Sequence, residues 1–177
     1  MSTGQGPEEF SDAQRSGLDV RQADHDRTLA AVHRLEAMLG TAAPGREAAW
    51  RAEVASALVA LDEATAEEAD NAEAVDSLLS DIARTQPWLR NRVRGLRLQS
   101  RQSRTALGSL RRELDQPAEA PVDFADLRQR LGWVLAGLRH QKARESDLIY
   151  EAYYDAFRAD LAADTDGPQR TAGQQQS

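Results

Sequence analysis

The strongest constraint on the fold is an apolar periodicity that runs through most of the chain with few breaks. Between residues 12 and 163 apolar side chains recur every three or four positions, as on one face of a helix. Gly and Pro interrupt this pattern at residues 40–45, 85–87 and 116–121. Such residues end helices or stand in their first turns. Because short connections favour antiparallel neighbours, we predict an all-α fold, an antiparallel up-down-up-down four-helix bundle.

The periodic segments define the predicted helices and the domain boundaries. We expect helices over residues 12–39, 46–82 with a break near 69–71, 89–114 and 123–152, with Asp123 as an N-cap. Residues 1–11 and 164–177 are rich in Gly, Pro, Gln and acids, and we predict that both are disordered tails. One domain, residues 12–163, remains between them.

Composition excludes several classes of function. The 177 residues contain no Cys, so a disulfide framework, a Cys-based zinc site and a Cys nucleophile are ruled out. A net charge of −7 argues against nucleic acid and anionic membranes as partners. No apolar run approaches the roughly 18 residues of a membrane span, and the N-terminus does not resemble a signal peptide. We therefore expect a soluble, cytoplasmic protein.

Each predicted apolar face is interrupted by polar residues near its middle. These residues are His25, Glu68, Ser100, Arg104, Gln141 and Glu145. If the helices align, the six side chains meet in one buried polar layer, although residue counting leaves His25 about one turn short of Glu68. An isolated charge in a core is costly, so such a layer needs a metal ion or a hydrogen-bonded network.

At this point the sequence resembles the hemerythrin-like (HHE cation-binding) family over about Ala23 to Leu161. The resemblance lies in DHDRTLAAVHRLEAML (24–39), ALVALDEATAEEAD (57–70), SLLSDIARTQPWLRNRVRGL (77–96) and LRHQKARESDLIYEAYYDAF (138–157). It implies a four-helix bundle with a non-haem di-iron centre held by His and bridging carboxylates. At the positions that the resemblance assigns to ligands, His25, Glu68 and Glu145 are retained. Ala64, Ser100, Arg104 and Gln141 stand at the others, with His140 as an off-face substitute.

These replacements predict a degenerate member of the family without a di-iron centre. Arg104 at a ligand position would neutralise Glu68 and Glu145 and leave a metal-free polar core. We then expect no enzyme activity and a role as a binding or regulatory module. The alternative is a protein that binds non-haem iron through His25, Glu68, His140 and Glu145 and senses or binds O2 or another oxidant. A metal-free enzyme that uses Glu68 and Glu145 would need an accessible pocket beside them.

Two surface features complete the predictions. Arg90, Arg94, Arg97, Arg101 and Arg104 form a stripe, which we expect to pair with acids such as Asp62, Glu67 and Asp70 or to be solvated. The alternative interpretation is that the stripe binds an anionic partner. Tyr150, Tyr153, Tyr154 and Phe157 surround more than one side of their helix, so some of them are available for self-association or for an unknown protein partner.

Overall fold

The computed structural model describes residues 9–41, 43–116 and 123–166, and within these ranges it contains helices and no strand. The helices are α1 (Asp12–Gly40), α2 (Glu47–Glu73), α3 (Leu78–Thr85), the short 3₁₀ helix η1 (Pro87–Leu89), α4 (Arg90–Asp115), α5 (Phe124–Ala152) and α6 (Tyr154–Asp166). The prediction of an all-α fold is confirmed. The boundaries of the long helices follow the Gly and Pro breaks closely.

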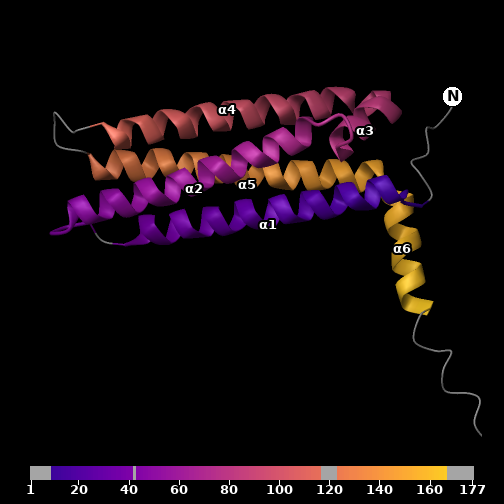
Figure 1. The fold of residues 1–177 in the computed structure, drawn as a ribbon, viewed down its shortest axis with the longest axis horizontal. Coiled ribbons are helices and arrows are strands. Elements are labelled where there is room, and N and C mark those ends of the chain that lie inside the picture. The colour runs from indigo at the N-terminus through magenta and orange to yellow at the C-terminus, as the bar shows by residue number, and fades with distance from the viewer. Residues whose placement is uncertain (1–8, 42, 117–122, 167–177) are drawn as a thin grey trace, which may run out of the picture.

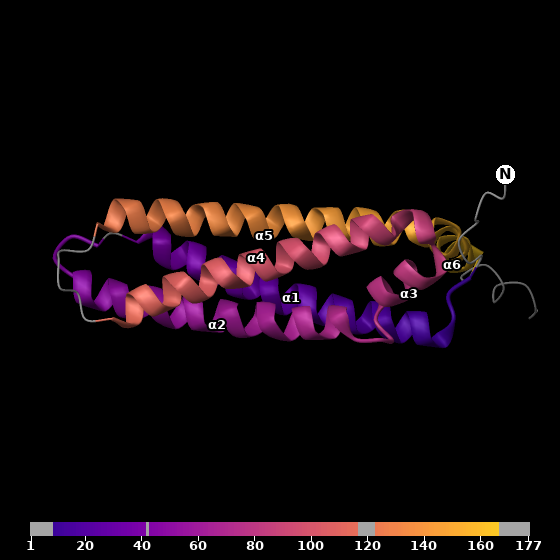
Figure 2. The same ribbon diagram turned by 90° about the horizontal axis from the view of Figure 1, so that it is seen from above.

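The four long helices α1, α2, α4 and α5 lie side by side along the longest axis of the molecule (Figures 1 and 2). The short helix α3 lies at one end, between the end of α2 and the start of α4. At this same end the chain bends at Tyr153, and α6 points away from the long axis (Figure 1). Within the described residues, α3 and α6 therefore both lie at this one end of the molecule.

Side-chain caps fix several helix starts. Ser11 and Gln14 form a capping box at α1, and Ser77 accepts a hydrogen bond from the Ser80 amide at α3. Asp123 accepts hydrogen bonds from the amides of Ala125 and Asp126, so its predicted role as the N-cap of α5 is confirmed. The break predicted near residues 69–71 lies later, because α2 continues to Glu73 and α3 begins at Leu78.

The domain boundaries differ from the prediction at both ends. Phe10, placed in the N-terminal tail, is buried against the rings of Tyr153 and Phe157, and α6 continues to Asp166, beyond the predicted end of the domain at residue 163. The rest of the predicted tails, residues 1–8 and 167–177, lies outside the described residues.

The buried apolar side chains form two separate clusters. One surrounds Trp50, which is fully buried and donates a hydrogen bond from Nε1 to the Met38 carbonyl at 3.0 Å. The other lies at the α3 end and includes Leu79, Ile82 and Tyr153. The clusters are separated along the long axis, and the gap between them lies at the level where the sequence predicted a polar layer.

None of the helices in the described part of the chain combines the length and apolar character needed to cross a membrane.

Candidate functional site

A buried ionic layer fills the gap between the two apolar clusters. Its most deeply buried members are Asp24 and Thr28 of α1 and Lys142 of α5, which are 4%, 1% and 6% exposed. Charged groups at such depth are stable only when they are paired and hydrogen-bonded. The layer is therefore defined by its pairs.

Lys142 and Glu68 form the central pair. The Lys142 ammonium contacts Glu68 Oε1, and the two side chains are 7% and 14% exposed. Thr28 Oγ1 donates a hydrogen bond to Glu68 Oε2 at 2.8 Å, so both oxygens of this carboxylate have a partner. Helices α1, α2 and α5 are thereby joined through a single carboxylate.

Two further ion pairs flank the central one. Arg21 Nε lies 3.3 Å from Glu145 Oε1, and an Arg21 terminal nitrogen donates to Ser146 Oγ at 2.7 Å. Asp24 accepts hydrogen bonds from the Asn71 side-chain amide at 2.9 and 3.1 Å. It also lies 3.3 Å from Arg27. The three acids Asp24, Glu68 and Glu145 thus face the three cations Arg21, Arg27 and Lys142.

Burial changes the proton affinity of two bases in this layer. It lowers the pKa of Lys142 to about 8; Glu145 partly opposes this effect, whereas Arg21 adds to it. Burial also lowers the pKa of His25, and the positive charges of Lys142 and Arg21 lower it further. His25 Nδ1 is buried and has no hydrogen-bond partner among the described residues. Burial and the two cations thus favour the neutral form of the His25 imidazole.

The structure brings four of the predicted layer residues to one place. Glu68, Ser100, Gln141 and Glu145 line a small cavity of about 20 Å³ between α2, α4 and α5. Asn71 and Lys142, which hold the carboxylates in place, were not among the predicted residues.

Arg104 does not take the place that the sequence predicted for it. Its guanidinium lies 4.0 Å from Asp70, and its side chain is 39% exposed. The cations that face Glu68 and Glu145 are instead Lys142 and Arg21. Two sequence signals point to Lys142: it continues the spacing Leu131, Leu135, Leu138 along α5, and it is the single Lys among 22 Lys and Arg residues.

The donor set does not fit the di-iron centre that the family resemblance implies. His33 and His140 are exposed, and the Lys142 ammonium faces Glu68. Within residues 9–41, 43–116 and 123–166 no group of three or more His, Cys, Asp or Glu side chains is arranged to hold a metal ion.

A cleft opens directly beside the ionic layer. Its volume is about 430 Å³, and it lies between α1, the end of α2, the turn into α3, and α5. Apolar side chains such as Val20, Leu78 and Ile149 form its walls, whereas Arg21, Asp24, Glu68, Asn71 and Glu145 line it on the side of the layer. The volume and this mixture of surfaces are typical of a small-molecule site.

Gly17 of α1 brings two walls of the cleft together. A Cβ atom at this position would lie 3.0 Å from Leu78 Cγ, closer than an ordinary contact. The absence of a side chain lets the start of α3 approach α1 at the mouth of the cleft.

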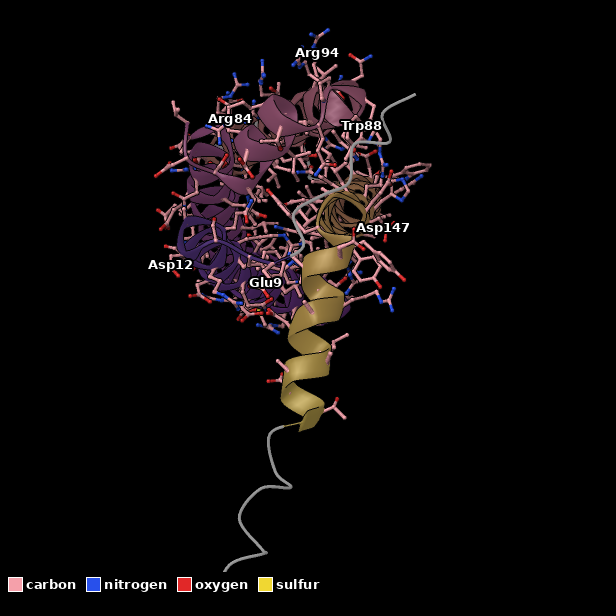
Figure 3. All side chains as sticks on the ribbon, turned by 90° about the vertical axis from the view of Figure 1, so that its right-hand side faces the viewer. Glu9, Asp12, Arg84, Trp88, Arg94 and Asp147 are labelled. Atoms are coloured by element: carbon pink, nitrogen blue, oxygen red, sulfur yellow. The ribbon has the colours of Figure 1, made fainter. Side chains whose placement is uncertain are left out.

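The arginine stripe of α4 is largely occupied by contacts with α2 and α3. Arg97 donates to the Ala72 carbonyl and to Ser80 Oγ, while Arg101 pairs with Glu73. Arg94 points outward at the end of the molecule that carries α6 (Figure 3). The predicted partners Asp62 and Glu67 pair with Arg111 and Arg27.

The aromatic residues near the end of α5 divide into buried and exposed groups. Tyr153 is fully buried and donates to Asp81 Oδ2 at 2.7 Å. Tyr150 and Tyr154 are 51% and 44% exposed, and their rings meet edge to face at 5.5 Å.

Comparison with protein-family models, with curated proteins and with solved structures finds no match for this chain. The hemerythrin-like assignment stays a prediction that depends on the residues alone.

Proposed function

We propose that this chain is a non-catalytic, ligand-binding member of the hemerythrin-like type that has exchanged a metal centre for a network of ion pairs. The order of the long helices supports the architecture: α1, α2, α4 and α5 run alternately in opposite directions along the long axis (Figure 1). This arrangement matches an up-down-up-down four-helix bundle.

The observation that carries the proposal is the position of the cleft. A space of about 430 Å³ opens onto the layer where Glu68, Glu145, Asp24 and their cations meet. In such a site apolar walls provide affinity, and a few fixed polar groups determine how a ligand is oriented. The ion pairs hold those polar groups in place.

The same pairs favour binding over acid–base catalysis. Glu68 contacts Lys142, and Glu145 faces Arg21. A general base must be free to accept a proton in its working state, and a neighbouring cation stabilises the ionised, less basic carboxylate. The two carboxylates that could form an acid–base pair are therefore better suited to hold charge than to move protons.

Binding in the cleft is tested by NMR with a diverse set of small-molecule fragments. Ala13 lines the cleft and is exposed, so Ala13→Leu fills part of the space without disturbing the core. Ala30→Leu places the same side chain on an exposed part of α1 outside the cleft. We expect fragments to shift the resonances of cleft residues in the wild type and in Ala30→Leu. The shifts should be much smaller in Ala13→Leu. An absence of hits, or equal binding to all three proteins, would contradict the proposal.

Metal analysis of the purified protein tests the second part of the proposal, that ion pairs replace a metal centre. We expect no stoichiometric metal, because Lys142 contacts Glu68 where a cationic centre would have to lie. Stoichiometric iron that is lost in His25→Ala would instead support the oxidant-sensing alternative.

A further inference from the structure

We propose that the cleft beside the ionic layer takes an amphipathic organic cation, that is, an amine attached to an apolar chain or ring. This inference rests on the proposed function, because it names the class of ligand for that cleft. It follows from the walls, the charge balance and one carboxylate oxygen.

The walls select for an apolar body. Ala13, Val20 and Ala72 contribute methyl groups from α1 and α2, and Leu78, Leu79 and Ile149 close the cleft from α3 and α5. A volume of about 430 Å³ accommodates a small molecule rather than a single ion. Burial of apolar surface would supply most of the affinity.

The charges that line the cleft select for a cation. Asp24, Glu68, Asp76 and Glu145 line the cleft, and Arg27, Lys142 and Arg21 face three of these four acids, so the acids outnumber the nearby cations by one among the described residues. The guanidinium of Arg21 already faces Glu145 and donates to Ser146. A net charge of −7 over the whole chain favours the approach of cations and opposes that of anions.

Glu145 provides the specific contact. Its Oε1 lies 3.3 Å from Arg21 Nε, and among the described residues no hydrogen bond to Oε2 is found. The side chain is 12% exposed, and it lines the cleft. An ammonium group on a ligand would satisfy this oxygen with a charge-assisted hydrogen bond, while the apolar part of the ligand packs toward Val20 and Leu78.

Three probes that share one chain length test the inference. Octylamine is cationic at neutral pH, octan-1-ol is neutral and octanoate is anionic. Affinities are measured by calorimetry, and the site is mapped by amide chemical shifts. We expect octylamine to bind about tenfold more tightly than octan-1-ol, because its ammonium gains one charge-assisted hydrogen bond. Octanoate should bind most weakly, because its carboxylate adds a repulsion.

Two pairs of variants separate the contributions of charge and shape. Glu145→Gln should reduce octylamine affinity to about that of octan-1-ol, whereas Asp147→Asn, which removes an exposed acid from the same helix, should leave it unchanged. Ala13→Leu should weaken all binding, and Ala30→Leu should not. Circular dichroism and urea midpoints confirm that each variant is folded.

The outcomes distinguish this inference from the proposed function. If octan-1-ol or octanoate binds as tightly as octylamine and Ala13→Leu blocks it, the cleft is a ligand site but not one for cations. If Asp147→Asn weakens octylamine binding as much as Glu145→Gln does, the attraction is general and Glu145 is not the contact. If no probe binds while fragments still do, the ligand class is wrong and the proposed function stands. If neither probes nor fragments bind, both fail.

Discussion

Replacing Lys142 tests the ionic layer most directly, because this residue is the chain's only Lys and lies at its centre. Lys142→Met keeps much of the side-chain volume and removes the charge, so Glu68 is left ionised and largely buried beside Thr28. Breaking a buried pair in this way is strongly destabilising, and we expect a loss of about 3 kcal/mol in the free energy of unfolding.

Removing the charge of Glu68 instead of that of Lys142 should lower the free energy of unfolding by less, and the pKa of Lys142 explains why. In Glu68→Gln the amide oxygen still accepts from Thr28, and the unpaired ammonium can lose its proton. A pKa of about 8 lies close to neutral pH, so deprotonation of the Lys142 ammonium at pH 7 costs only about 1 kcal/mol. We therefore expect a loss of about 1–2 kcal/mol for Glu68→Gln and a similar loss for the double variant Glu68→Gln/Lys142→Met. Because the double variant loses no more than Glu68→Gln alone, the coupling energy of the pair is about 3 kcal/mol.

Urea unfolding followed by circular dichroism at pH 7 measures all four proteins of this cycle. Because the chain has one Lys, a protein labelled with ¹³C at lysine Cε gives a single resonance, and its titration should show a midpoint near 8 rather than near 10.5. A loss below about 1 kcal/mol for Lys142→Met, or single losses that add in the double variant, would refute the pairing on which the layer depends.

Three further perturbations test other parts of the structure. The pKa of His25 is lowered by burial and by Lys142 and Arg21, so the unfolded chain takes up a proton first as the pH falls through 6.5 and stability drops. His25→Gln should flatten this loss below about pH 6.5, whereas His140→Gln should not, as urea midpoints will show. Asp123→Ala should cost about 1 kcal/mol through loss of the α5 cap, measured in the same way. Trp50→Ala should cost about 3–5 kcal/mol and lower the thermal midpoint, since the ring is fully buried; a change under 1 kcal/mol would contradict its central position.

The sequence pattern predicted helices well because their boundaries depend on local chemistry. Asp123 caps α5 through its own side chain, and the Gly and Pro residues at 40–45 stop one helix before the next begins. The interruptions of the apolar seams also pointed to residues that the structure brings close together, because an interrupted seam leaves a gap in the core. Glu68 and Glu145 are two of these residues.

The partners within the layer were harder to predict, because they depend on the relative rotation of helices. Gln141 and Lys142 are neighbours in the sequence and both reach the layer, and the rotation of α5 about its axis decides which of them contacts Glu68. Arg104 likewise lies at the edge of α4 and turns toward Asp70. The bend at Tyr153 was missed for a similar reason: no Gly or Pro marks it, and a buried hydrogen bond to Asp81 holds that residue in place.

The ionic layer has a structural consequence that the apolar clusters lack. Seams of Leu and Ala tolerate a shift of one helix along its neighbour, since one methyl group replaces another at small cost. The pairs Thr28–Glu68 and Asp24–Asn71 form in only one register of α1 against α2, because a shift of one turn would leave buried polar groups without partners. Those same two helices form one side of the cleft. The layer therefore fixes the register on which the shape of the cleft depends, a role that does not require its charged groups to add to the stability of the core.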